Sequence, residues 1–312
     1  MIYTLTLNLA LDLTYETNYL TKNNINKTKL KTISVGGKGI NVSRALNCLD
    51  VKSLALGFYG GRFYDFINRT LEGENIKTNF IKIKDDSRIN IKIIENKEKN
   101  LIELNEIGPF IYMNETKLLI NKIKTLLKPG DFFIIGGSLP RNINANIYKK
   151  IIDTLKKKRV TVLFDSSGPS LSKGLMSTPE ILKINLRELK EICKISDTKK
   201  NNKEIVKVLK NYIAEGIKTI IITDGPKEAV YYDKNNYFIA KPPYIKDHLS
   251  STGSGDAVDA GLIYSISNGY SAEDILKFSI SCGSANLLND TPGLISLDEV
   301  KRLVKEVKIK TL

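Results

Sequence analysis

The chain has 312 residues, and its 48 lysines and arginines exceed its 34 aspartates and glutamates by 14. The basic residues are spread along the chain rather than gathered in a block, so the charge suits small anionic ligands and indicates no specific nucleic-acid site. No apolar run approaches the roughly 20 residues of a membrane span, and no basic leader precedes the first strand pattern. Three scattered cysteines fit neither a disulfide framework nor a metal cluster, and we expect a cytoplasmic protein without membrane contact.

The first third of the chain predicts a β-rich region with only two helices. The polar, β-leaning segment 11–35 and the alternating runs within 88–105 have no helices to cover them, so we expect them to pair as a small separate sheet. The other elements expected here are a strand over 2–8, a helix opening at the glycine turn of 36–39, a strand at 53–58, a helix at 63–72 and a strand near 78–83.

From residue 114 onward, predicted helices and strands alternate. This rhythm predicts an α/β fold with a mainly parallel sheet that is covered by helices on both faces. We expect residues 1–312 to form a single domain that carries the small sheet as an appendage. The helices are expected at 114–127, 144–157, 186–193, 203–214, 256–268, 271–288 and 297–306, and the strands at 131–136, 160–165, 181–184, 218–223, 228–233 and 236–240.

Residues 250–261, SSTGSGDAVDAG, form a glycine-rich turn that leads into a predicted helix. The first N–H groups of a helix lack internal partners and carry the positive end of the helix dipole, which favours binding of an anion such as phosphate. Asp256 would repel such an anion unless it acts as a base on a hydroxyl that attacks a bound phosphoryl group. On this stretch alone, a simple helix-capping role explains Asp256 equally well.

Clusters of small and polar residues follow five other predicted strands. In an open parallel sheet, ligands bind at the carboxyl ends of the strands, where such clusters come together. Each cluster by itself is a typical turn, but their repetition at strand ends predicts one shared site. The clusters are Asn8 with Asp12, 136–140, 165–168, 183–185 and 223–226.

Seven motifs follow one another along nearly the whole chain. They are Asn8-x-x-x-Asp12, Gly36-Gly37-Lys38-Gly39-Ile40-Asn41-Val42, Arg88-Ile89-Asn90, Gly137-Ser138-Leu139-Pro140, Asp165-x-Ser167-Gly168, Lys183-x-Asn185-x-x-Glu188 and Gly253-x-Gly255-Asp256. In kind and order they resemble the ribokinase-like (PfkB) family of sugar kinases, in its phosphosugar branch. The resemblance implies a ribokinase-like fold in which 11–35 and 88–105 form a β-sheet lid. Such a lid shields the site from water and pairs two copies into a homodimer.

The resemblance also implies the chemistry, which is transfer of a phosphoryl group from ATP, with Mg²⁺, to a sugar phosphate. Asp256 would be the general base, and the amides of Gly253, Ser254 and Gly255 would form an anion hole. Asn185 and Glu188 would place Mg²⁺, partly through water. The remaining nucleotide-side residues implied by the resemblance are Lys183, Thr223, Gly225, Gly283 and Asn289.

On the acceptor side, the resemblance implies that Asp12 binds sugar hydroxyls. Cations would hold the phosphate that the sugar already carries, because a dianion calls for paired positive charges. Lys38 and the run 88–92 favour fructose 1-phosphate as the acceptor, with tagatose 6-phosphate and fructose 6-phosphate as alternatives. The full acceptor set implied is Asp12, Gly37, Asn41, Lys38, Arg88, Lys27, Asn90 and Ser138.

Four residues depart from the family pattern. Leu9 and Ile184 stand where prolines are usual, Glu228 stands where glycine is common, and Asp259 adds an acid one turn after Asp256. We expect Asp259 to raise the pKa of Asp256 or to disturb Mg²⁺. A non-catalytic basic binding or regulatory protein on the kinase scaffold stays open as an alternative, because fold does not prove function.

Overall fold

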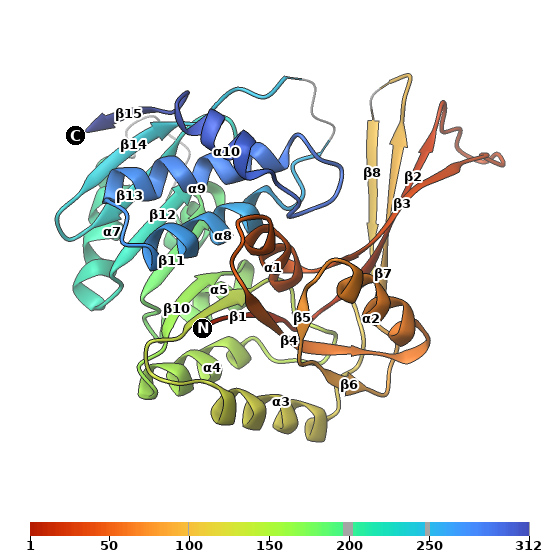
Figure 1. The fold of residues 1–312 in the computed structure, drawn as a ribbon, viewed down its shortest axis with the longest axis horizontal. Helices are drawn as coiled ribbons and strands as arrows, with labels where there is room; N and C mark the ends of the chain where they lie inside the picture. Colours follow the sequence, from red (N-terminus) through yellow and green to blue (C-terminus); the bar gives the residue numbers. More distant parts are fainter. Residues whose placement is uncertain (99, 196–201, 247–249, 312) are drawn as a thin grey trace.

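A computed structural model describes residues 1–98, 100–195, 202–246 and 250–311 (Figure 1). Two sheets organise the chain, a large one and a four-stranded one. No helix within these described ranges combines the length and the apolar character that crossing a membrane requires. The elements of the first third are β1 (Ile2–Thr6), β2 (Ala10–Thr17), β3 (Lys29–Gly36), α1 (Lys38–Cys48), β4 (Ser53–Gly60), the short 3₁₀ helix η1 (Gly61–Phe63), α2 (Tyr64–Gly73), β5 (Lys77–Thr78), β6 (Ile81–Ile83), β7 (Arg88–Glu95) and β8 (Asn100–Asn105).

Helices and strands then alternate, as predicted. The elements are α3 (Met113–Leu126), β9 (Phe132–Gly136), α4 (Asn146–Lys157), β10 (Thr161–Asp165), α5 (Gly168–Leu175), β11 (Ile181–Asn185), α6 (Leu186–Cys193), α7 (Asn202–Glu215), β12 (Thr219–Thr223), β13 (Ala229–Asp233), β14 (Tyr237–Lys241), α8 (Ser254–Ser267), α9 (Ala272–Asn286), α10 (Leu297–Val304) and β15 (Lys308–Thr311). Two of them, α5 and β15, were not expected from the sequence. The strand expected near 78–83 is two short strands, β5 and β6, which both pair with β4.

The large sheet has 11 strands in the order β15-β14-β13-β12-β11-β10-β9-β1-β4-β5, with β6 also paired to β4. Its strands run parallel from β5 through β12, and β13, β14 and β15 add to this edge in antiparallel fashion. Parallel strands need crossover connections, which the intervening helices supply. The carboxyl ends of β1, β9, β10, β11 and β12 therefore meet along one edge, as the strand-end clusters predict.

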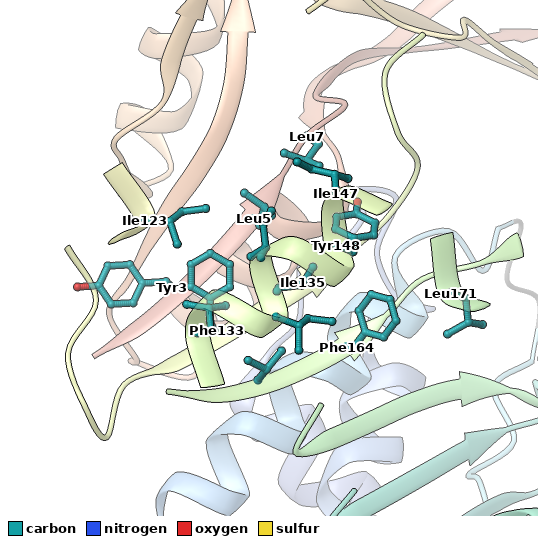
Figure 2. Packing of buried hydrophobic residues seen from close by; sticks show 14 of the residues in the cluster. Tyr3, Leu5, Leu7, Ile123, Phe133, Ile135, Ile147, Tyr148, Phe164 and Leu171 are labelled. Atoms are coloured by element: carbon teal, nitrogen blue, oxygen red, sulfur yellow. The ribbon is translucent and has the colours of Figure 1, made fainter. Parts of the chain in front are cut away.

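Alternating apolar residues along the central strands send side chains to opposite faces of the sheet. On one face Phe133, Ile135 and Phe164 pack against α3, α4 and α5, and Figure 2 shows this packing. On the other face Ile134 and Leu163 pack against α1, α8 and α9. The predicted mainly parallel sheet with helices on both faces is confirmed, and α8 packs between α1 and α9 on this second face.

The four-stranded sheet, called the lid sheet here, has the order β3-β2-β7-β8 and extends away from the large sheet (Figure 1). The expected pairing of 11–35 with 88–105 is confirmed. Directly paired residues share a face of a sheet, so the register separates an apolar face from a polar one. The apolar face holds two cross-strand rows, Ile33-Leu13-Ile91-Leu104 and Leu30-Tyr15-Ile93-Ile102, while the polar face holds Ser34, Asp12, Asn90, Asn105, Lys92 and Glu103.

Candidate active site

Helix α8 begins at a left-handed residue, Gly253, whose φ of 85° lets the chain turn sharply into the helix. A Cβ at Gly253 would lie 2.7 Å from Cα of Pro292, so the turn also needs the missing side chain. Within the described ranges, the N–H groups of Gly253, Gly255 and Asp256 have no acceptor. The N–H of Ser254 donates to the carbonyl of Ser251 at 3.1 Å. The prediction that the Ser254 amide belongs to the anion hole is therefore wrong, because this N–H is already hydrogen-bonded within the turn. The N–H of Asp256 is open instead.

Asp256 is nearly buried, with 9% of its surface exposed. Lys38 Nζ donates to its Oδ1 at 2.7 Å, and Asn41 Nδ2 donates to its Oδ2 at 2.7 Å. Both donors lie on the first turn of α1, which Gly37 begins as the N-cap residue. One carboxylate is thus held by two donors from a single helix turn, which fixes its orientation at the N-terminus of α8.

Asp165, the last residue of β10, completes a buried charged cluster. Its Oδ2 accepts from Lys38 at 2.6 Å and from Lys183 at 2.7 Å. Burial alone would raise the pKa of Asp165, but the ammonium groups of Lys183 and Lys38 outweigh it and hold that pKa well below the ordinary value. Burial would likewise lower the pKa of Lys38, yet the carboxylates of Asp165, Asp256 and Asp259 raise it well above its usual range.

Lys38 therefore does not stand free to meet a phosphate on the sugar. Its ammonium group is engaged with two carboxylates beside the predicted base. Lys183 lies across the start of α8, because a Cβ on Gly255 would be only 2.7 Å from Lys183 Nζ. The two lysines thus flank Asp256 and the open amides, one on the side of α1 and one on the side of β11. Their predicted roles as ligands of substrate phosphates stay predictions.

The predicted acceptor residues gather at the base of the lid sheet. Asn90 Nδ2 donates to Asp12 Oδ1 at 2.7 Å, and the remaining oxygen of Asn90, Oδ1, is buried without a donor from the described residues. Burial raises the pKa of Asp12, against the opposing effects of Asn90 and Arg88. Asn8 Nδ2 lies 3.2 Å from Ser138 Oγ, which brings the end of β9 beside the end of β1. This arrangement offers polar atoms that sugar hydroxyl groups can contact.

Arg88 differs from the other arginines of its surroundings. It lines a cavity of about 340 Å³ together with Arg62 and Arg141. Arg62 pairs with Asp86 at 2.6 Å and Arg141 pairs with Asp85 at 3.3 Å, whereas Arg88 donates to the carbonyl groups of Asn8 and Glu106. Burial lowers the pKa of Arg88. Carbonyl partners leave its positive charge uncompensated by a hydrogen-bonded carboxylate, a state that suits binding of an anion.

Two of the predicted ligand residues, Lys27 and Asn289, do not lie with the other predicted site residues. Lys27 lies in the loop between β2 and β3 and is exposed, with its carbonyl accepting from Thr17 at the far end of β2. Five residues of extended strand separate Asp12 from Thr17, a distance of about 17 Å. Asn289 follows α9 and donates back to the carbonyl of Ala285. Their predicted ligand roles find no support in their position within one copy of the chain.

A cavity of about 510 Å³ lies between β11, β12 and the helices α8 and α9, and Ser254 and Gly255 at the start of α8 are among its lining residues. Its wall combines apolar side chains with the polar residues predicted for the nucleotide, and Gly283 is among its lining residues. A lining that combines apolar side chains with the charged Lys183 fits an adenine nucleotide. The lining includes Lys183, Asn185, Thr223, Gly225, Pro242, Pro243, Tyr244, Ser254, Gly255, Val258, Ile280, Gly283 and Leu287.

Asn185 and Glu188 form a capping box at the start of α6. The N–H of Glu188 donates to Asn185 Oδ1 at 2.8 Å, and the N–H of Asn185 donates to Glu188 Oε2 at 3.0 Å. Burial raises the pKa of Glu188. Within the described ranges, Glu188 Oε1 has no donor, and the carboxyl group is close enough to Asp165, Lys183 and Lys38 for their charges to act on its pKa. A single oxygen of this kind fits Mg²⁺, which keeps most of its water ligands.

Two further residues, which the sequence analysis did not identify, stabilise the site. Lys92 Nζ, on the polar face of the lid sheet, donates to Ser250 Oγ at 2.9 Å and Thr252 Oγ1 at 3.1 Å, which ties the lid sheet to the glycine turn. Asn286, buried at the end of α9, donates to the carbonyl of Thr252 at 3.0 Å and accepts from the N–H of Gly293 at 2.7 Å. The run 88–92 signalled Lys92, but nothing local marks Asn286.

The departures from the family pattern have structural explanations in three cases. Leu9 and Ile184 are buried and pack into apolar clusters, so aliphatic packing takes the place of the usual prolines. Asp259 is fully buried beside the charged cluster, with its Oδ2 3.7 Å from Lys38 Nζ. Nothing in the structure explains Glu228.

Comparison with known proteins agrees with this geometry. Residues 5–296 match the pfkB family carbohydrate kinases. The chain is 36% identical to 1-phosphofructokinase of Borreliella burgdorferi over 100% of this chain and 99% of that protein, and 30% identical to tagatose-6-phosphate kinase of Staphylococcus epidermidis over 99% of each. Phosphofructokinase-2 from Escherichia coli, solved with substrates and products, superposes with a TM-score of 0.91 at 25% identity over 98% of both chains. The chain therefore belongs to the pfkB family of carbohydrate kinases.

Proposed function

We propose that this kinase transfers the γ-phosphoryl group of ATP to the free terminal hydroxyl of fructose 1-phosphate, which yields fructose 1,6-bisphosphate and ADP. The observation that carries the proposal is the position of Asp256. It lies in the first turn of α8, directly after Ser254 and Gly255, which line the nucleotide-sized cavity, and beside three open amides. A base beside an anion hole is the arrangement that phosphoryl transfer to a hydroxyl requires.

In the proposed reaction, Asp256 accepts the proton of the sugar hydroxyl as its oxygen bonds to the γ-phosphorus, and the bond from that phosphorus to the bridging oxygen of ADP breaks. Lys38 and Asn41 keep the carboxylate of Asp256 aimed at the hydroxyl through their hydrogen bonds of 2.7 Å. The open N–H groups of Gly253, Gly255 and Asp256 stabilise the charge that develops on the transferring group.

The nucleotide would occupy the cavity beside α8 and α9, with its phosphates toward Lys183. Mg²⁺, when bound, neutralises charge on the phosphate oxygens. Glu188 would hold it through Oε1, either directly or through water, and Asn185 keeps Glu188 in place through the capping box. The apolar lining contributed by Val258, Ile280 and Leu287 excludes water from the base end of the nucleotide.

The acceptor would bind at the base of the lid sheet. Asp12 and the donor-free Oδ1 of Asn90 accept hydrogen bonds from sugar hydroxyls, and Arg88 holds the existing phosphate. Similarity to 1-phosphofructokinase of Borreliella burgdorferi, at 36% identity, supports fructose 1-phosphate. The 30% identity to tagatose-6-phosphate kinase makes tagatose 6-phosphate the second candidate, and fructose 6-phosphate is the third.

We also propose that the chain works as a single domain and a homodimer joined through the lid sheet. The apolar face of that sheet carries Leu30, Ile33, Ile102 and Leu104 with 40–55% of their surface exposed. Large exposed apolar side chains in register across a sheet indicate a surface that another protein covers. The polar face of the same sheet carries Lys92 and Asp12, which belong to the candidate site.

The test is ADP release, coupled to an indicator reaction, with Mg-ATP and each of fructose 1-phosphate, tagatose 6-phosphate and fructose 6-phosphate. We expect the largest kcat/KM with fructose 1-phosphate. A preference for either 6-phosphate would preserve the mechanism and replace the substrate. Absence of sugar-dependent ADP release with all three would count against a phosphosugar kinase and favour a non-catalytic binding role.

A further inference from the structure

Asp259 lies on α8 one turn after Asp256, with none of its surface exposed. Neither of its carboxylate oxygens has a hydrogen-bond partner among the residues that the structure describes. An ionised carboxylate buried without donors is strongly unfavourable. The Asp259 carboxylate must therefore either be neutralised by nearby cations or be protonated.

The neighbouring ammonium groups are already engaged. Lys38 Nζ donates to Asp165 at 2.6 Å and to Asp256 at 2.7 Å, and it stands 3.7 Å from Asp259 Oδ2, which is too far for a hydrogen bond. Lys183 Nζ, on β11, donates to Asp165 at 2.7 Å. Two ammonium groups balance the carboxylates of Asp165 and Asp256. If Asp259 were ionised, three carboxylates would face two ammonium groups, and the buried cluster would carry a net charge of −1.

A neutral Asp259 removes this imbalance. Burial, followed by the negative charge of Asp165, raises the pKa of Asp259 well above its ordinary value, against the opposing effects of Lys183 and Lys38. Carboxylate oxygens of Asp165, Asp256 and Asp259 all lie within 4.8 Å of one another. The ammonium groups of Lys38 and Lys183 lie among these oxygens and pair with Asp165 and Asp256. A proton on Asp259 can instead form a hydrogen bond to Asp165.

We propose that Asp259 is a neutral carboxylic acid that donates a hydrogen bond to Asp165, and that it is a positioning residue for the Lys38 ammonium group that orients Asp256. The proposal differs from the expectation that Asp259 raises the pKa of Asp256 or disturbs Mg²⁺. Its catalytic consequence rests on the proposed function of Asp256 as a base, whereas its protonation state can be tested without any substrate.

The decisive experiment is the melting temperature of the wild-type protein and of Asp259→Asn between pH 5 and pH 8. Asparagine keeps a neutral donor of the same shape. In the wild type, the unfolded chain gives up the Asp259 proton above about pH 4 while the folded chain retains it, so the unfolded state binds fewer protons and stability falls as pH rises. We expect the melting temperature of the variant to exceed that of the wild type by a margin that grows with pH.

An ionised Asp259 that pairs with the lysines predicts the opposite sign, with the variant melting below the wild type across this pH range. That result, or a difference that does not change with pH, would overturn the proposal. Asp50→Asn is the matched control, because Asp50 is exposed in the turn after α1. It should show no pH-dependent difference.

A second measurement uses the wild-type protein and so does not depend on whether a variant folds. In wild-type protein labelled with carbon-13 at the aspartate carboxyl groups, one carboxyl carbon should keep the chemical shift of a protonated acid at pH 7 and should not titrate between pH 4 and pH 8. If every aspartate carboxyl carbon has the shift of an ionised group at pH 7, Asp259 is charged and the proposal fails.

Kinetics test the positioning role. Asp259→Asn should keep the kcat and the pH profile of the wild type, whereas Asp259→Val, which cannot donate, should lower kcat about fivefold, the equivalent of about 1 kcal/mol, with KM unchanged for both substrates. Equal kcat in the two variants would remove the positioning role. Wild-type protein inactive on every sugar phosphate would refute the proposed function, and the melting temperatures would still decide whether Asp259 is neutral.

Discussion

The charged cluster at the edge of the large sheet and the lid sheet are built in opposite ways. In the cluster, Lys38, Asp165 and Lys183 are buried or nearly so and are joined by hydrogen bonds of 2.6–2.7 Å. In the lid sheet, every residue of β8 is exposed, and the side chains of Lys92 and Glu103 contact the glycine turn. The proposed reacting groups are thus held by buried ion pairs, whereas the lid sheet is held by exposed contacts, an arrangement that suits an enzyme with a closing lid.

The difference also predicts how each region responds to mutation. Removing one partner of a buried charge pair leaves an uncompensated charge, which is strongly destabilising. Removing an exposed side chain from the lid sheet changes the stability of the subunit little. Mutations in the cluster should therefore affect chemistry or folding, and mutations in the lid sheet should affect acceptor binding or assembly.

The largest effect is expected at Asp256. Asp256→Asn removes the proposed base while keeping the shape of the side chain, so kcat should fall about a thousandfold, within the range typical of general-base removal. Coupled ADP release with fructose 1-phosphate measures it. Asp50→Asn, an exposed site, is the control and should keep full activity. Unchanged turnover in Asp256→Asn would refute the assignment of the base.

Asp165→Asn should chiefly affect folding. It leaves the ammonium groups of Lys38 and Lys183 without their shared carboxylate, so the free energy of unfolding should fall by about 3 kcal/mol, as measured by urea denaturation at pH 7. The folded-state pKa of Asp165 is lowered, so its stabilisation exists above the unfolded pKa of about 4 and is lost as pH falls. The difference from the wild type should therefore narrow below pH 4. A difference that widens there would contradict the ion-pair explanation.

Arg88→Met should act on acceptor binding alone. Loss of a charge-assisted hydrogen bond to a phosphate is worth about 1.5–3 kcal/mol, so KM for the sugar phosphate should rise at least about tenfold. KM for ATP should not change, because Arg88 lines a different cavity from the one predicted for the nucleotide. Arg69→Met, on the exposed face of α2, is the control. Equal increases in both KM values would indicate a general loss of structure instead.

The smallest effect on subunit stability is expected in the lid sheet. Leu104→Glu, in β8, places a charge on the apolar face and should shift the protein from dimer to monomer in sedimentation velocity, with the free energy of unfolding of the subunit changed by less than about 0.5 kcal/mol. Leu118→Glu, in α3, is a matched control because the two leucines are 55% and 54% exposed. Dissociation by both variants, or by neither, would argue against an interface on this face.

The family, the α/β architecture and the pairing of 11–35 with 88–105 followed from the sequence by itself. Local patterns determine these features: apolar periodicity separates helices from strands, and turns rich in glycine mark strand ends. Helix α6 was predicted at its observed bounds for this reason, and α8 was predicted with Asp256 in its first turn. Helix α5 was missed because Gly168, Pro169 and Ser170 are typical of a turn.

Only the tertiary structure decided how the charges of the site are paired. Lys38 and Asp256 lie 218 residues apart, and their hydrogen bond depends on the packing of α1 against α8. The folded core also decides that Asp259 is buried without a hydrogen-bond donor from the described residues. Local sequence indicates which residues carry chemistry, but their charge states depend on burial and on partners from distant strands, which the folded core alone brings together.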